Sequence, residues 1–142
     1  TPWHHGPFRF HMVPAAHNLR EQDGAGHERF IGLIIEVGGV CIYHSGDTVY
    51  YDGMEDILRS WSIDVALLPI NGNVPARGVA GNLDGIEAVT LARAIHAGMV
   101  VPCHYDMFTF NTAHPAVFET HATQCGQAYR IMQAGERLDV AG

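Results

Sequence analysis

The sequence predicts an α/β protein built around a mixed sheet. Strand-like runs, either alternating or rich in β-branched residues, dominate the first third of the chain, and helical and strand-like segments then alternate. With 142 residues, 47 % of them hydrophobic, the chain is long enough to bury one sizeable core. Because a division would leave neither part with a core, we expect a single domain over residues 1–142.

Three predicted strands open the chain. The first alternates apolar and polar residues and is stopped by Pro14, because proline has no backbone N–H to donate. The second and third flank Gly38-Gly39, a pair typical of a two-residue β-hairpin turn. These strands are expected at residues 8–13, 30–37 and 40–44.

A short helix and a buried strand are expected next. Apolar residues recur at helical spacing over residues 54–61, and residues 63–70 form an almost fully apolar run, which suits a strand buried on both faces. Residues 71–83 contain three glycines, a proline and three asparagines. They predict a long loop, and long loops in compact domains are often functional.

The next predicted helix has clear capping signals at both ends. Asp84 is a good N-cap, and Glu87 completes a capping box three residues later. We expect this helix to end at a left-handed Gly98. The remaining predicted elements are a strand at residues 99–103, a helix over residues 115–124, and strands at 128–132 and 137–140.

Composition and charge narrow the function classes. The formal net charge is −7, with 8 Lys and Arg against 15 Asp and Glu, which disfavours a nucleic-acid partner. No apolar run approaches the roughly 18 residues of a membrane-spanning helix, so no membrane partner is expected. The three cysteines are too scattered for a disulfide framework, which indicates a reducing compartment and favours the cytoplasm.

Candidate metal ligands come just after several of the predicted strands. His17, Asp47, Asn71 and His104 all occupy such positions, and ligands bind beyond the carboxyl ends of strands in open α/β sheets. Two imidazoles and a carboxylate suit Zn²⁺, Mn²⁺ or Fe²⁺. Each residue also has a plain structural explanation: a surface histidine, an Asx turn at Asp47, or an asparagine that holds its loop. The residues by themselves therefore predict a candidate metal site and leave the structural explanation open.

Four segments in a fixed order resemble the metallo-β-lactamase superfamily. They are VPAAH (13–17), YHSGDT (43–48), LPINGN (68–73) and VPCHYDMF (101–108). Within that superfamily they look most like the L-ascorbate-6-phosphate lactonase branch. The resemblance implies an αββα sandwich with the metal site at one edge, of which this chain represents mainly the C-terminal half.

The resemblance also implies roles for individual residues. His17 matches a ligand of a first metal, Asp47 a bridge between two metals, and His104 a ligand of the second, so Asp47 and His104 would act directly in catalysis. Asn71 and Asn82 lie in segments that resemble the lining of the lactonase pocket. The implied activity is hydrolysis of a lactone or ester of a phosphorylated sugar acid, a small-molecule substrate, by water that one or two Mn²⁺ or Zn²⁺ ions activate.

One departure from the family pattern is large. The family's His-x-His-x-Asp-His motif is absent, and no Asp-His dipeptide occurs in the chain. That motif would supply two ligands to each metal, so we expect the missing N-terminal half of the fold to act as a partner. Half a sandwich would also expose an apolar sheet face, which predicts packing on the missing half or a homo-oligomer.

Three functions remain open at this point. Besides the metal-dependent hydrolase, the chain could be a non-catalytic half-domain that acts as a scaffold or binding module. A phosphodiesterase or nuclease on the same fold is the third, which the acidic charge disfavours. Arg77, in the long loop, could bind a substrate phosphate through its guanidinium or could simply be solvated.

Overall fold

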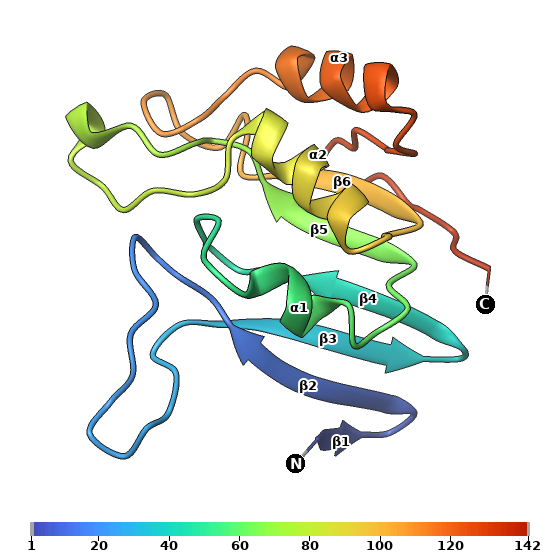
Figure 1. Cartoon of the computed structure of the whole chain (residues 1–142). Coiled ribbons are helices and arrows are strands. Elements are labelled where there is room, and N and C mark those ends of the chain that lie inside the picture. Colours follow the sequence, from blue (N-terminus) through green and yellow to red (C-terminus); the bar gives the residue numbers. More distant parts are fainter. Residues whose placement is uncertain (1, 142) are drawn as a thin grey trace.

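A six-stranded sheet with the order β1-β2-β3-β4-β5-β6 forms the centre of the computed structural model, which describes residues 2–141 (Figure 1). Neighbouring strands are antiparallel from β1 to β4 and parallel from β4 to β6, so the predicted mixed sheet is confirmed. The strands are β1 (Trp3–His5), β2 (Phe8–Pro14), β3 (Ile31–Val37), β4 (Val40–His44), β5 (Val65–Pro69) and β6 (Met99–Cys103).

In residues 2–141, three α-helices accompany the sheet. They are α1 (Met54–Leu58), α2 (Gly85–Ala94) and α3 (Ala116–Cys125), and a single 3₁₀ turn, η1 (Pro75–Arg77), lies in the long loop. The predicted helices are thus confirmed, although α1 is shorter than expected. Within residues 2–141, none of these helices has the length and apolar character needed to cross a membrane.

The hairpin between β3 and β4 has the predicted turn. Gly38 and Gly39 have φ values of 58° and 84°. A two-residue turn of this kind requires positive φ at both positions, which glycine adopts without steric cost. The turn sets the register in which Ile35 lies opposite Ile42 and Ile34 opposite Tyr43.

One face of the sheet carries the hydrophobic core. Ile34, Tyr43, Leu68 and Val100 are fully buried on this face, and α1 and α2 cover it (Figure 1). Successive strand residues point to opposite faces, so their neighbours in each strand lie on the other side. The same alternation that predicted the strands therefore defines the core.

The opposite face of the sheet is apolar and partly exposed. Met12 is 67 % exposed and Trp3 60 %, and Phe10, Leu33 and Ile42 on the same face are only half-buried. Contiguous apolar surface of this kind usually marks a region that another surface covers. The exposed sheet face expected for half a sandwich is therefore present.

Helix α2 begins as predicted but ends earlier. The Asp84 carboxylate accepts hydrogen bonds from the first-turn amides, and the Glu87 carboxylate accepts one from the Asp84 amide, which completes the capping box. The left-handed residue after the helix is His96, with φ 56°, and not Gly98. Gly98 is required for a steric reason, because a Cβ at this position would lie only 2.9 Å from the backbone oxygen of Asp64.

The two strands predicted in the C-terminal tail are wrong. Residues 128–132 form only an isolated parallel bridge between Val100 and Tyr129, and residues 137–140 form no strand. The Val100 amide donates to the oxygen of Ala128, and the Arg130 amide donates to the oxygen of Val100. The next donor in this ladder would be Pro102, which has no N–H, so the pairing stops. Strand β1, in turn, was not predicted.

Candidate metal centre

Four loops meet at one edge of the sheet. Strands β2, β4, β5 and β6 all run in the same direction and end at this edge, which is on the left in Figure 1. The loops that follow them carry the residues predicted to form a site. Topology therefore explains why side chains far apart in the sequence meet here.

Asp47 lies between the two histidines predicted as metal ligands. His17 Nε2 is 3.8 Å from Asp47 Oδ2, and His104 Nε2 is 3.9 Å from Asp47 Oδ1. The structure thus brings together all three side chains that the sequence singled out. Each carboxylate oxygen faces a different imidazole.

The three side chains form two pairs, His17 with Asp47 and His104 with Asp47, and each pair has too few ligands to hold a metal ion by itself. Among residues 2–141, no three His, Cys, Asp or Glu side chains form a group that could hold a metal ion. A single site with three protein ligands, which residue types alone suggested, is therefore not formed. Each pair offers one imidazole nitrogen and one carboxylate oxygen, a donor set that fits Zn²⁺ or Mn²⁺ but needs further ligands.

A cavity of about 180 Å³ adjoins these pairs. Asp47 and His104 line it together with apolar side chains such as Leu67 and Met107. Cys103 lies at the same cavity, and burial raises the pKa of its thiol. A protonated thiol is a poor nucleophile and a poor metal ligand, so Cys103 adds no reactive thiol to this cavity.

Gly46 positions the loop that carries Asp47. Its φ is 63°, and a Cβ at this position would lie 2.9 Å from the backbone oxygen of Ile31. Only glycine meets both conditions without strain. The Gly46 amide also donates to His44 Nδ1 at 3.0 Å, so His44 supports the loop from the end of β4.

Thr48 connects the loops of the candidate ligands and was not predicted. Its buried hydroxyl accepts from the Ala16 amide at 3.0 Å and donates to the Val49 oxygen at 2.8 Å. Its backbone oxygen accepts from the Leu83 amide at 2.8 Å. Thr48 therefore fixes the loops of His17, Asp47 and Asn82 relative to one another. Its place beside Asp47 in the YHSGDT segment was the available signal.

The backbone of His104 is in a rare conformation. His104 has φ 60° and Asp106 has φ 55°, in the left-handed region that non-glycine residues seldom adopt. Residues held in this region cluster at functional sites. His104 Nδ1 is buried and has no hydrogen-bond partner in the described part of the chain. An imidazole that binds a metal through one nitrogen normally donates a hydrogen bond from the other to a nearby acceptor. The Nδ1 of His104 has no such acceptor among the described residues.

Asn71 and Asn82, predicted to line a substrate pocket, lie beneath Asp47. They expose only 2 % and 1 % of their surface. Asn82 Nδ2 donates to Asp47 Oδ1 at 3.3 Å and to Asn71 Oδ1 at 3.0 Å. In this arrangement both amides contact protein groups and support the carboxylate.

Arg77 turns toward the protein. Its Nη1 donates to the backbone oxygen of Asn71 at 2.6 Å, and its Nη2 donates to that of Thr112 at 3.0 Å. These contacts leave the predicted binding of a substrate phosphate without structural support, because the guanidinium is already engaged. Asn111, which also lies within reach of Arg77, was not predicted.

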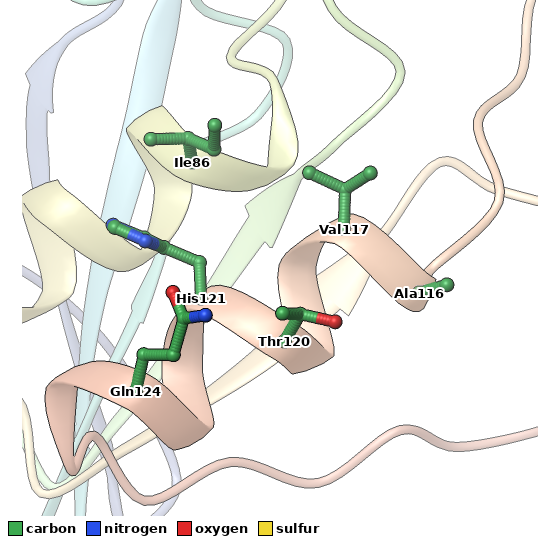
Figure 2. Close-up of a pocket in the computed structure, with 6 residues that line it drawn as sticks. All are labelled: Ile86, Ala116, Val117, Thr120, His121 and Gln124. Carbon is green, nitrogen blue, oxygen red and sulfur yellow. The ribbon is translucent and has the colours of Figure 1, made fainter.

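A second cavity, of about 290 Å³, lies between α2 and α3 (Figure 2). Val117 and His121 of α3 point toward Ile86 of α2, and Thr120 and Gln124 complete part of the lining. None of the candidate ligands lines this cavity. It therefore adds nothing to the metal centre.

Comparison of the sequence with known proteins identifies a family over most of the chain. The family profile described as "Beta-lactamase superfamily domain" matches residues 1–105. A metal-dependent hydrolase (UPF0173) of Methanoculleus marisnigri is 39 % identical over 103 residues, which cover 70 % of this chain and 43 % of that protein. A protein of the same name from Pelotomaculum thermopropionicum is 32 % identical over 134 residues, which cover 91 % of this chain and 56 % of that protein.

Among solved structures, the chain resembles Igni18, described as a novel metallo hydrolase from Ignicoccus hospitalis. The TM-score is 0.71 at 28 % identity, and the match covers 92 % of this chain and 52 % of that chain. This chain thus spans about half the length of the relatives that it matches.

Proposed function

This chain belongs to the metallo-β-lactamase superfamily, and on that premise we propose that it supplies half of the metal site of a metal-dependent hydrolase. The observation that carries the proposal is the approach of His17 and His104 to separate oxygens of Asp47, at 3.8 and 3.9 Å. Relatives named as metal-dependent hydrolases support the same activity.

The side chains have distinct roles in this proposal. His17 and Asp47 Oδ2 would hold one ion, and His104 and Asp47 Oδ1 the other, with Mn²⁺ or Zn²⁺ as the ions that suit these donors. When bound, a divalent metal supplies Lewis acidity toward a substrate carbonyl and toward water. The apolar wall of the cavity at Leu67 would exclude bulk water from the reacting groups.

The remaining metal ligands would come from the other half of the sandwich. The chain matches only 43 % and 56 % of the length of the two relatives described above, and the sheet face around Phe10 and Met12 is open. We propose that the part of the fold absent from this chain packs on that face and completes the site. A second copy of the chain is the alternative occupant, and light scattering of the purified chain distinguishes a dimer from a monomer.

For the substrate, we propose a lactone or ester of a phosphorylated sugar acid. The support is the resemblance of the segments that contain His17, Asp47, Asn71 and His104 to the lactonase branch. A panel with a sugar-acid lactone, an aryl ester and an aryl phosphodiester, each assayed with Mn²⁺ and Zn²⁺ after the fold is completed, tests this. Turnover of the phosphodiester alone would replace the lactonase proposal with a phosphodiesterase.

Metal binding by the 142-residue chain tests the central proposal. Equilibrium dialysis against Zn²⁺ or Mn²⁺, followed by elemental analysis, should show bound metal that Asp47→Ala removes. Asp23→Ala is the matched control, because Asp23 also pairs with a histidine, His27, at 3.2 Å, but at a separate surface loop. Equal metal content in the wild type and Asp47→Ala would contradict the proposal.

A non-catalytic half-domain is the second candidate. Among the described residues no three ligand-type side chains form a metal-holding group, and this observation favours a scaffold role. A chain that binds no Zn²⁺ or Mn²⁺ in the dialysis, and still none after its open sheet face is covered by a partner, would establish this alternative.

A further inference from the structure

A chain of hydrogen bonds runs from Arg77 to Asp47 through three asparagines. Arg77 Nη1 donates to Asn111 Oδ1 at 3.5 Å, and Asn71 Nδ2 donates to the same oxygen at 2.9 Å. Asn82 Nδ2 donates to Asn71 Oδ1 at 3.0 Å and to Asp47 Oδ1 at 3.3 Å. The chain therefore links the loops after β4, β5 and β6.

The two ends set the direction of every donor in this chain. A guanidinium can only donate, so Asn111 turns its oxygen toward Arg77 and also accepts from Asn71. Asn71 therefore offers its own oxygen to Asn82, whose amide nitrogen is left to meet Asp47. An ionised carboxylate can only accept, so the far end imposes the same direction. Turning either buried amide around would bring two acceptors into contact.

Burial of the two inner asparagines keeps water from replacing the hydrogen bond between them. Asn71 and Asn82 are almost completely buried. Arg77 holds the Asn71 backbone as well as the Asn111 side chain, because Nη1 also donates to the Asn71 oxygen at 2.6 Å. Its Nη2 donates to the oxygen of Thr112 at 3.0 Å, which fixes the loop that carries Asn111.

The last donor in the chain orients the Asp47 carboxylate. The Asp47 side chain is 45 % exposed, so water alone would leave it free to rotate about its Cβ–Cγ bond. Asn82 holds Oδ1, the oxygen that faces His104 at 3.9 Å, and Oδ2 is thereby directed to His17 at 3.8 Å. Rotation of the carboxylate would disturb both pairs at once.

We propose that Arg77 is a positioning residue for Asp47, acting through Asn111, Asn71 and Asn82 so that the carboxylate presents one oxygen to each histidine. Its consequence for metal binding rests on the proposed function, whereas the orientation of Asp47 is a property of the metal-free chain. In this role Arg77 directs its charge to the support of the site and not to a substrate phosphate.

Carbon-13 NMR of the metal-free chain tests the orientation directly. Arg77→Met removes the donor, so the carboxyl carbon of Asp47 should shift, whereas Arg77→Lys keeps a donor-only cation and should restore most of the wild-type shift. Arg59→Met is the matched control, because Arg59 Nε also donates to a backbone oxygen, that of Ala94, at 2.8 Å, but between α1 and α2. An Asp47 signal that responds no more to Arg77→Met than to Arg59→Met overturns the proposal.

Asn111 provides a second pair of variants in case Arg77→Met does not fold. Asn111→Asp keeps an acceptor between Arg77 and Asn71 and should preserve the Asp47 signal. Asn111→Leu removes that acceptor and should shift it as Arg77→Met does. Equal spectra for the two variants would contradict the proposed direction of the chain.

Titration with Co²⁺, followed by its absorption spectrum, separates this proposal from the proposed function. Supporting residues of this kind typically change metal affinity by about 10- to 100-fold, so Arg77→Met should weaken Co²⁺ binding at least tenfold, and Arg77→Lys much less. Wild-type chain that binds no Co²⁺ while the Asp47 carbon still responds to Arg77→Met refutes the proposed function and supports the positioning role. An Asp47 carbon that does not respond to Arg77→Met refutes the positioning role, whatever the metal does.

Discussion

The hydroxyl of Thr48 accepts a hydrogen bond of 3.0 Å from the backbone amide of Ala16, and the Thr48 side chain is fully buried. Ala16 directly precedes one candidate ligand, and Thr48 directly follows another. This contact, with the 2.8 Å bond from the Val49 amide to the Ala16 oxygen, therefore holds His17 beside Asp47. The distance between the two candidate ligands depends on it.

Replacement of Thr48 by valine should destabilise the fold. Valine has nearly the same shape but leaves the buried Ala16 amide without an acceptor, which costs about 1–3 kcal/mol of unfolding free energy. Urea denaturation measures the loss, and Thr48→Ser, which keeps the hydroxyl, should lose less than Thr48→Val. The opposite order would show that the methyl group of Thr48 matters more than its hydroxyl.

Replacement of Gly46 by alanine should be more harmful than the same change at Gly38. Both glycines have φ near 60°, at 63° and 58°, so both variants carry the strain of a left-handed alanine, about 1–2 kcal/mol. Only at Gly46 would the new Cβ also meet a backbone oxygen, that of Ile31, at 2.9 Å, whereas nothing lies within 4 Å at Gly38. Thermal unfolding of the two variants compares them, and equal losses would argue against the close contact.

Replacement of Met12 by lysine should reduce the association of two copies of the chain through their open sheet faces. Met12 is 67 % exposed on that face, and Met107, 66 % exposed in a loop outside the sheet, is its matched control. A lysine in the centre of a covered apolar surface would bury an unpaired charge, which is costly. Sedimentation velocity should show less association for Met12→Lys than for Met107→Lys. If the two variants sediment alike, this face is not the one that associates.

The thiol of Cys41 should be unreactive until the pH is high. Burial and the nearby Glu36 and Asp64 carboxylates raise its pKa from 9.0 to about 11, so at pH 8 its thiolate fraction is roughly 100-fold below that of an ordinary cysteine. Alkylation by iodoacetamide, followed by mass spectrometry, should be slow at Cys41 in the native chain and fast in urea. Comparable rates in both states would exclude the raised pKa.

The raised pKa of Cys41 also predicts how the free energy of unfolding changes at alkaline pH. Between pH 9 and 11 the unfolded chain releases the Cys41 proton and the folded chain keeps it, so the folded chain binds more protons. The free energy of unfolding should therefore fall as the pH rises through this interval. Cys41→Ala should flatten that part of the profile, and an unchanged slope would assign the effect to other groups.

Local signals in the sequence were sufficient for most of the secondary structure. Alternation and β-branched runs predicted β2 to β6, and the Gly38-Gly39 pair predicted the hairpin between β3 and β4. The capping box at Asp84 predicted the start of α2. These features depend on residues within a few positions of one another. The strand predicted at residues 128–132 failed for the opposite reason, because its pairing with β6 required a backbone N–H at position 102, which is a proline.

The sequence by itself also placed the three candidate ligands at one edge of the sheet, because His17, Asp47 and His104 each follow a strand that ends there. Only the tertiary structure decided that each histidine faces a different oxygen of Asp47, and that Arg77 turns inward to Asn71. These relationships join loops that are remote in sequence. Their distances are set by how the sheet, the turns and the buried asparagines pack together, and no local pattern of residues encodes them.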